Sequence, residues 1–135
     1  MAWSWSPLQG NLGRQNLSET IFQLDFVPYG WLFPRMTGVA IHGGSGTTAA
    51  ALRAGVPTLI VPFLMDQFYW GRRVFELGAG PRPIPFKRLT AERLAEAIIC
   101  MVNDSAMAAK AAALGENIRA EDGVGQAIKI IDQYG

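Results

Sequence analysis

The feature that most constrains the fold is a glycine-rich turn between two short apolar runs. These runs, Val39 to His42 and Thr58 to Val61, are each followed by Gly or Pro. Between them Thr47 to Ala54 is rich in alanine, and Gly55 and Pro57 follow it as typical stop signals of a helix. A parallel strand, helix and strand unit is right-handed almost without exception. We therefore predict an α/β fold with a parallel sheet and helices over its faces.

Further elements follow from the same kind of pattern. A strand is predicted over Ile21 to Val27, which is rich in β-branched and aromatic residues, and Met1 to Trp5 is equally consistent with a strand or a ragged end. Helices are predicted over Gln67 to Leu77, from the cap residue Thr90 to Val102, over Ser105 to Arg119, and after Gly123 to Ile131.

Three or four strands are fewer than a complete doubly wound sheet contains. We therefore expect a partial Rossmann-like sheet with flanking helices, in a single domain of residues 1–135. An incomplete sheet leaves an uncovered edge, and an uncovered edge is a template for pairing. We expect the chain to pair with another chain or to self-associate as a dimer or larger species.

Composition excludes several classes of function. Twelve Lys and Arg against eleven Asp and Glu leave a net charge of +1, so no strong field attracts nucleic acid. The single Cys100 excludes an internal disulfide and a multi-cysteine zinc site, and it favours a reducing compartment. No apolar run is long enough to span a membrane, and the first residues lack the pattern of a secretion signal. We expect a cytoplasmic location, with peripheral membrane association left open, and neither a metal nor a cofactor.

The turn from His42 to Thr48 is the strongest candidate binding site. It follows a predicted strand, at the edge where open parallel sheets bind ligands. Glycines let phosphates approach the backbone, and the start of a helix favours an anion. The candidate residues are Gly43, Gly44, Ser45, Gly46, Thr47 and Thr48. A diphosphate fits this turn, and the alternative is a tight turn whose hydroxyls cap the helix.

Two other phosphate-binding motifs are relevant. A Walker A loop is excluded because no lysine follows the glycines. Gly44, Gly46 and Ala49 satisfy the G-x-G-x-x-A pattern of dinucleotide-binding proteins, and Asp66 follows at about the expected twenty residues. This pattern alone is weak evidence for NAD.

Three polar residues lie at the predicted ends of the strands. His42 is the only histidine, and its ring can donate to a phosphate oxygen or transfer a proton, although a lone histidine is more often structural. Asp66 and Gln67 follow the next strand and can bind the vicinal hydroxyls of a sugar. The alternative for Asp66 is a helix cap.

The helix predicted after Asp66 carries aromatic and basic residues. The aromatic residues are Phe68, Tyr69, Trp70 and Phe75. We expect them in the core, with the lining of an apolar acceptor pocket as the alternative. Arg72 and Arg73 are expected on a solvated face.

The segment from His42 to Pro81, HGGSGTTAAALRAGVPTLIVPFLMDQFYWGRRVFELGAGP, closely resembles the donor-binding segment of family 1 glycosyltransferases of the GT-B fold. The resemblance is strongest to the sterol and lipid glucosyltransferase branch related to UDP-glucuronosyltransferases. With DFVPYGWLFPR before it and PIPFKRLTAERLAEAI after it, the resemblance runs from about Ile21 to the end. It implies the second half of a GT-B C-terminal domain.

The resemblance also implies roles for the candidate residues. His42 would contact the diphosphate of a nucleotide sugar, usually UDP-glucose, and the turn from Gly44 to Thr48 would supply N–H and hydroxyl donors to it. Asp66 and Gln67 would bind hydroxyls of the sugar. This explains why the glycine turn and the acid-amide pair occur together, and the NAD interpretation leaves that to chance.

The segment from Phe26 to Tyr29 would hold the base, with Phe26 and Val27 as the binding residues. Plant-type members carry Trp and Gln where Phe26 and Tyr29 stand here, and a ribose-binding Glu where Ala50 stands. The sequence therefore departs from that pattern at the base and the ribose.

The resemblance implies inverting transfer of a hexose to a hydroxyl of a lipid, sterol or other apolar acceptor, with the departing diphosphate stabilised by backbone dipoles and no required metal. The family's catalytic base belongs to an N-terminal acceptor domain, so no catalytic residue is expected in this chain. We expect little or no turnover from the chain alone. The alternative is a non-catalytic module that binds a nucleotide sugar or a partner chain.

Overall fold

The structure is a computed structural model that describes residues 2–4, 20–24 and 26–134. Its strands are β1 (Ala2–Ser4), β2 (Phe22–Leu24), β3 (Val39–Ile41) and β4 (Thr58–Ile60). Its helices are α1 (Tyr29–Leu32), α2 (Ser45–Ala54), α3 (Gln67–Glu76), α4 (Ala91–Asn103), α5 (Ser105–Ala120) and α6 (Gly123–Tyr134), with short 3-10 helices η1 (Phe33–Arg35) and η2 (Phe86–Arg88). The chain is an α/β protein, as its sequence predicts.

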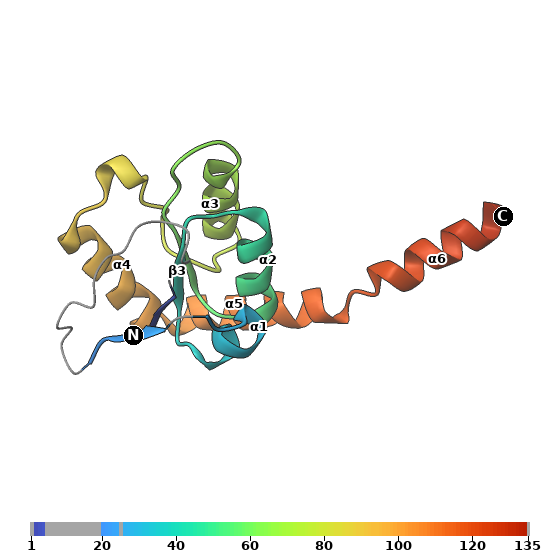
Figure 1. The fold of residues 1–135 in the computed structure, drawn as a ribbon, viewed down its shortest axis with the longest axis horizontal. Helices are drawn as coiled ribbons and strands as arrows, with labels where there is room; N and C mark the ends of the chain where they lie inside the picture. The colour runs from blue at the N-terminus through green and yellow to red at the C-terminus, as the bar shows by residue number, and fades with distance from the viewer. Residues whose placement is uncertain (1, 5–19, 25, 135) are drawn as a thin grey trace.

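The unit β3, α2 and β4 forms the centre of the molecule (Figure 1). The two strands are parallel, with Val39 opposite Thr58 and Ile41 opposite Ile60. On one face, Ile60 packs in a buried cluster with Leu52 of α2 and residues of α3 and α5. On the other face, Leu59 packs in a cluster with residues of α4 and α5. Because β4 is buried on both faces, Leu59 and Ile60 are apolar, and Thr58 is the one polar residue of this strand.

The strands form two sheets, whereas we expected one. β1 pairs with β2 and β3 pairs with β4, and both pairings are parallel. The strand predicted over Ile21 to Val27 is confirmed in a shorter form as β2. Within Met1 to Trp5 the described strand is β1.

One edge of the β3–β4 sheet is covered by a proline-rich segment. Thr58 N donates to the Ala79 carbonyl at 2.9 Å, Ile84 N donates to the Ile60 carbonyl at 3.1 Å, and Phe86 N donates to the Pro62 carbonyl at 3.0 Å. The expected open edge is therefore occupied along β4. In the described part of the chain, β3 pairs only with β4.

The predicted helices are confirmed, with shifted ends. α2 begins at Ser45, two residues earlier than predicted, because the glycine turn already enters the helix. Thr90 caps α4, since its hydroxyl accepts a hydrogen bond from Arg93 N at 3.3 Å. The short helix α1 was not predicted, because it lies among proline and glycine residues that usually interrupt helices.

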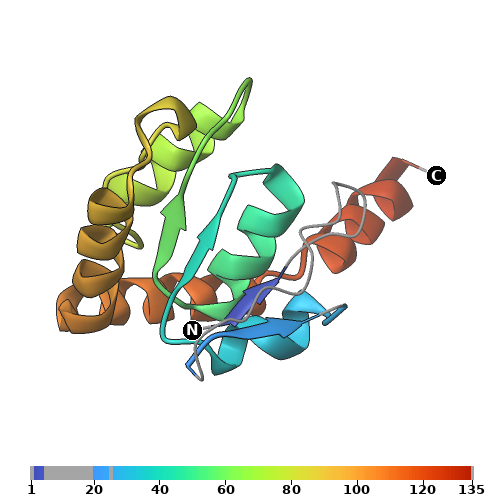
Figure 2. The same cartoon turned by 60° about the vertical axis from the view of Figure 1, so that its left-hand side comes forward.

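The last helix, α6, extends away from the body of the molecule in both views (Figure 2). All of its described residues are exposed except Gly125, which is half-buried. Within the residues that the structure describes, no single helix is long and apolar enough to cross a membrane. The run of α4 with α5 and α6 passes that test only as a pair of segments bent by 73°.

Candidate functional site

The first turn after β3 requires glycine at position 43. Gly43 has a φ of +94°, which side-chain-bearing residues rarely adopt. A Cβ atom there would also lie 2.6 Å from Ile60 Cγ2 and 3.2 Å from the Gln67 carbonyl oxygen. The close approach shows that the fold brings the glycine turn and the start of α3 together, as predicted from the ends of parallel strands.

His42 folds back over the same turn. A Cβ atom on Gly44 would lie 2.5 Å from His42 Nε2, so the imidazole ring occupies the space that a side chain at position 44 would need. The His42 side chain is exposed. Its ring therefore lies at the surface, beside the first residues of α2.

The start of α2 presents unused hydrogen-bond donors. Gly44 is the N-cap residue and Thr48 N donates to its carbonyl at 2.9 Å, but no side chain caps the helix. In the described structure, the backbone N–H groups of Ser45, Gly46 and Thr47 have no acceptor. These amides and the positive end of the helix dipole form an anion site. The alternative role of the hydroxyls as helix caps is not what the structure shows.

Gly46 distinguishes a ligand site from a packing requirement. A Cβ atom on Gly46 would meet no atom within 4 Å, and the residue is exposed. Nothing in the described chain demands glycine at this position. Open space over a helix N-terminus is the arrangement that a bound phosphate needs.

Thr48 differs from the expectation that its hydroxyl lies in the site. Its side chain is fully buried, on the inward face of α2 with Ala51 and Leu52. Its Oγ1 atom has no hydrogen-bond partner among the described residues, and its backbone N–H donates to the Gly44 carbonyl. The helical spacing of three and four residues places Thr48 on the core side, whereas Ser45 is exposed.

Asp66 and Gln67 have different surroundings although they are neighbours. Gln67 Oε1 accepts hydrogen bonds from Phe63 N at 2.8 Å and Leu64 N at 3.2 Å, so the side chain holds the turn between β4 and α3. Its amide nitrogen remains as a donor. The Asp66 carboxylate is exposed and has no hydrogen bond in the part of the chain that the structure describes. Asp66 stands at the N-cap position without capping the helix.

Phe26 and Val27 come shortly before α1, which packs against α2 through the buried cluster that contains Leu32 and Ala51. The ring of Phe26 is 85% exposed. Val27 is half-buried against the cluster that contains Leu32 and Ala51. Tyr29 stacks on Phe33 with ring centroids 4.7 Å apart. The segment therefore offers one free aromatic face and a backbone anchored to α2.

The aromatic residues of α3 were expected in the core, and this was wrong. Phe68, Tyr69 and Phe75 are 47%, 60% and 42% exposed, and Trp70 is half-buried. The helix packs on β4 through Gly71 and Val74 instead. A Cβ atom on Gly71 would lie 3.3 Å from Ile60 Cγ2, and Val74 is fully buried. Arg72 and Arg73 are exposed, as predicted.

The loop between β4 and α3 contains features that the sequence reasoning missed. Phe63, Leu64 and Met65 are all exposed, and Met65 has a φ of +54°. Three successive apolar residues between a strand and a helix were the available signal. Within the described ranges, no group of three His, Cys, Asp or Glu side chains is placed to hold a metal ion.

Comparison with known proteins identifies the family. Residues 9–130 match the model of the erythromycin biosynthesis protein CIII-like C-terminal domain. The chain belongs to this family of glycosyltransferase C-terminal domains. The resemblance seen in the sequence is thereby confirmed, and the match begins earlier than the predicted start at Ile21.

Relatives of this domain include sterol 3-beta-glucosyltransferases. The chain is 43% identical over 96% of its length to sterol 3-beta-glucosyltransferase UGT80B1 of Arabidopsis thaliana. It is 46% identical over 82% of its length to a sterol 3-beta-glucosyltransferase of Cryptococcus neoformans. The chain spans only 21% and 7% of these two proteins.

Solved glycosyltransferases share the fold. The glycotransferase of kitacinnamycin superimposes with a TM-score of 0.86 at 24% identity, over 98% of this chain and 34% of that protein. Glycosyltransferase VinC, solved in complex with DTDP, superimposes with a TM-score of 0.74 at 30% identity, over 87% of this chain and 31% of VinC. The fold is that of the C-terminal domain of GT-B glycosyltransferases, as predicted.

Proposed function

We propose that this chain binds the nucleotide sugar of a hexosyl transfer to the hydroxyl of a sterol or another apolar acceptor. The observation that carries the proposal is the open N-terminus of α2: among the described residues, three of its amides have no acceptor and no packing contact requires the glycine at position 46. The sterol glucosyltransferases among the relatives support a glucose donor, and the DTDP complex of VinC supports a nucleoside diphosphate at this fold.

The diphosphate is assigned to His42 and the turn that follows. The amides of Ser45, Gly46 and Thr47, with the exposed hydroxyl of Ser45, donate to its oxygens, and the absence of Cβ atoms on Gly43, Gly44 and Gly46 lets the turn close and the ligand approach. His42 lies over Gly44 and can donate from its ring. Thr48 is not assigned a direct contact with the diphosphate, because its side chain is buried in the packed face of α2.

The sugar is assigned to the edge beside this turn. The free Asp66 carboxylate accepts from hexose hydroxyls, and the amide nitrogen of Gln67 donates to them, because its oxygen already holds the backbone. The close approach of Gly43 to the Gln67 backbone supports this assignment, because it brings the start of α3 next to the glycine turn. Phe26 and Val27 are assigned to the base.

In the transfer, a base deprotonates the acceptor hydroxyl, which attacks the anomeric carbon as the diphosphate departs. The chain's own part is to stabilise the negative charge of the leaving diphosphate with oriented amides, whose dipoles are in place before charge develops. The base is assigned to an acceptor domain outside these 135 residues, either in the same protein or in a partner chain. Residues 1–135 then form one donor-side domain, and we assign it to a reducing, cytoplasmic compartment.

Calorimetry with UDP, UDP-glucose and NAD tests the proposal. The wild-type chain is expected to bind UDP and UDP-glucose but not NAD, with little or no glucosyl transfer when a sterol is added. His42→Ala should weaken the affinity for UDP at least tenfold, because a hydrogen bond to a charged group contributes about 1.5–3 kcal/mol. Lys129→Gln on α6 is the matched surface control. No heat with either uridine nucleotide, or robust transfer by the isolated chain, contradicts the assignment.

Self-association is the remaining proposal for a partner. Since the proline-rich segment covers β4, pairing is assigned to the edge of β3 that carries no other strand within the described ranges. Sedimentation velocity should then show a dimer or larger species, and a strictly monomeric profile contradicts it.

A further inference from the structure

The stretch of chain that builds the proposed base and diphosphate subsites contains no acidic residue. Residues 26–65 include neither Asp nor Glu. Asp66 follows directly, but it stands at the start of α3 and is assigned above to the hexose. The pentose of a nucleotide joins the base to the diphosphate, so it has to cross the surface between these two subsites. That surface therefore receives no carboxylate from residues 26–65.

Ala50 stands where the two proposed subsites meet. It lies on α2 one turn after Gly46 and Thr47, because residues three and four positions apart share a helix face. Ala50 and Val27 both pack against the buried cluster that joins α1 to α2. Ala50 is half-buried, so part of its surface remains open to a ligand. This places an apolar methyl group next to the path from the diphosphate amides to the base segment.

The other side chains of the base segment are neutral. Phe26 presents an almost fully exposed ring, and an aromatic face stacks on a base without reading the hydroxyl groups of the adjoining pentose. Tyr29 is 41% exposed, and its ring lies nearly parallel to that of Phe33, with an angle of 14° between the planes. These rings hold a base in place and carry no charge that requires a pentose hydroxyl as its partner.

A hydroxyl is selected strongly only where the protein holds a polar group that needs it. A carboxylate that binds the 2′-hydroxyl of ribose loses a hydrogen bond when a deoxynucleotide takes the place of the ribonucleotide. An apolar surface loses no partner in that exchange, and it rejects an added hydroxyl only weakly. The methyl group of Ala50 belongs to the second class of surface.

We propose that the donor site accepts ribonucleoside diphosphates and 2′-deoxyribonucleoside diphosphates alike. The inference rests on the proposed function, because it names the class of nucleotide that the same site takes. The diphosphate is held by the amides at the start of α2, and the base by stacking on Phe26. Selection among donors then falls on the hexose beside Asp66 and Gln67, and the pentose contributes little to it.

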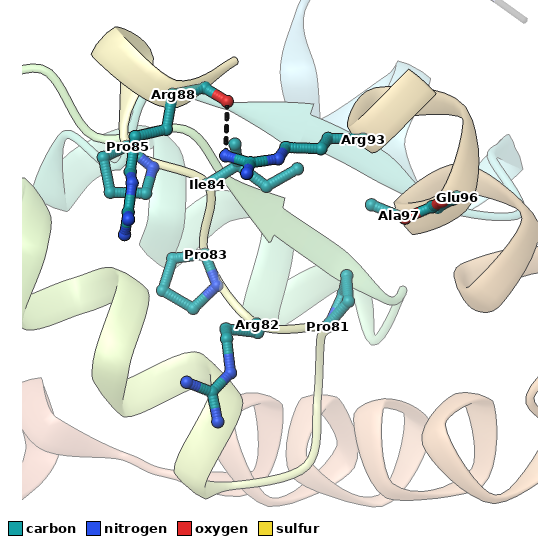
Figure 3. Close-up of a pocket in the computed structure, with 9 residues that line it drawn as sticks. All are labelled: Pro81, Arg82, Pro83, Ile84, Pro85, Arg88, Arg93, Glu96 and Ala97. Carbon is teal, nitrogen blue, oxygen red and sulfur yellow. Dashed lines mark hydrogen bonds between the residues drawn. The ribbon is translucent and has the colours of Figure 1, made fainter. Parts of the chain in front are cut away.

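A second place where a diphosphate can bind is a groove of about 420 Å³ between the proline-rich segment and α4 (Figure 3). Arg82, Arg88 and Arg93 line it, together with one acid, Glu96. Arg93 donates to the Arg88 carbonyl at 3.0 Å. A nucleotide held there by its phosphates alone would also bind equally with and without the 2′-hydroxyl. The experiment therefore has to separate the groove from the α2 site.

Calorimetry of the 135-residue chain with UDP and with 2′-deoxyuridine diphosphate tests the inference, because these nucleotides differ by one hydroxyl. Their dissociation constants are expected to agree within about threefold, since no charged partner of the hydroxyl is lost. Ala50→Glu is expected to create a preference for UDP of about tenfold or more, because a carboxylate accepts strongly from a hydroxyl. The ratio of the two affinities is the measured quantity, so a general loss of binding through charge repulsion does not obscure the result.

Matched variants place the same change elsewhere. Ala49→Glu adds the charge at an exposed neighbour on another face of α2 and should leave the ratio unchanged. Ala50→Gln has the size of Ala50→Glu without its charge and should give a smaller preference for UDP. Arg88→Gln with Arg93→Gln should leave both affinities as in the wild type. Asp25, which lies outside the described residues, is tested by Asp25→Asn, and the ratio should again stay unchanged.

The possible outcomes separate this inference from the proposed function. A wild-type preference for UDP beyond about threefold overturns the inference and leaves the proposed function in place. Loss of both nucleotides in Arg88→Gln with Arg93→Gln assigns them to the groove and overturns both, as does a wild-type chain that binds neither nucleotide. An unchanged ratio in Ala50→Glu, with binding retained, means that position 50 does not face the pentose and also overturns the inference.

Discussion

Two glycines of the same turn have opposite relations to the fold. The fold requires glycine at position 43, because a Cβ atom there would collide with Ile60 and the φ of +94° is unfavourable for other residues. Gly46 has no neighbour within 4 Å of its missing Cβ. Gly43 is therefore needed for the turn to form, whereas Gly46 is explained by the space that a bound ligand would need.

Gly46→Ala is therefore expected to keep or raise the free energy of unfolding, while it weakens the binding of the nucleotide donor. In a helix, alanine is more favourable than glycine by up to about 1 kcal/mol, and no clash opposes it. The new methyl group would stand where we propose that phosphate oxygens approach. Urea unfolding and UDP calorimetry on one sample should show an unchanged or higher unfolding free energy and a several-fold weaker affinity. Unchanged affinity would place the phosphates elsewhere.

Gly43→Ala is expected to destabilise the chain itself. The left-handed conformation and the overlap with Ile60 Cγ2 together should cost about 1–3 kcal/mol. The measurement is the urea midpoint, compared with that of Gly46→Ala. Equal midpoints for the two variants would show that the turn relaxes without cost.

At the scale of elements, Thr90 couples the start of α4 to the charge of Glu92. The pKa of Glu92 is lowered by a hydrogen bond from its own backbone N–H and another from the Thr90 side chain. A lowered folded-state pKa contributes stability above the ordinary value of 4.5, and this contribution is lost as pH falls through the folded value.

Thr90→Ala should raise the pKa of Glu92 towards its ordinary value and destabilise the chain by about 1 kcal/mol through the lost cap. Carbon-13 NMR titration of the Glu92 carboxyl and urea unfolding measure the two effects. Thr90→Ser, which keeps the hydroxyl, is the control and should behave like the wild type. A Glu92 titration that does not move in Thr90→Ala would assign the shift to the backbone alone.

The helix α6 is expected to exchange its amide hydrogens rapidly in the isolated chain. A helix of twelve residues is marginal in water unless packing supports it, and the large apolar side chains of α6 are exposed. Hydrogen–deuterium exchange should show protection in α2 and β4 far above that in α6, with α5 as the internal reference. Comparable protection in α6 would mean that its apolar face is covered in solution.

How far the sequence predicts this fold depends on the range of the interactions involved. The runs that form β3 and β4 and the turn at Gly43 carry local signals, and each was found in place. The exposure of Phe68 and Tyr69 was not predictable in this way, because it follows from α3 packing on β4 through Gly71. Likewise, hydrogen bonds from a distant proline-rich segment cover β4. The candidate site was predicted because its residues stand at the ends of strands, and Thr48 departs from the expectation because helical phase turns it inward.

At the scale of the whole molecule, the start of α2, the loop between β4 and α3 that carries Phe63, Leu64 and Met65, and the apolar side chains of α6 are open to solvent in the part of the chain that the structure describes. The first two lie at one end, whereas α6 extends away from the body (Figure 1). A domain that spans 21% of a sterol glucosyltransferase is expected to expose surfaces that other parts of that protein cover. The proposed donor site is built from residues of this chain, so we expect that nucleotide binding can be measured separately from turnover.

Saturating UDP should consequently stabilise the whole 135-residue chain. A ligand that binds only the folded state adds about 2.7 kcal/mol at a concentration one hundred times its dissociation constant. Urea unfolding should show this gain at an unchanged denaturant slope, and NAD at the same concentration should give none. Because the gain requires the phosphate site, it should fall in His42→Ala and persist in Lys129→Gln. Equal stabilisation of wild type and His42→Ala would mean that UDP binds away from the α2 turn, and would remove the basis for assigning the donor there.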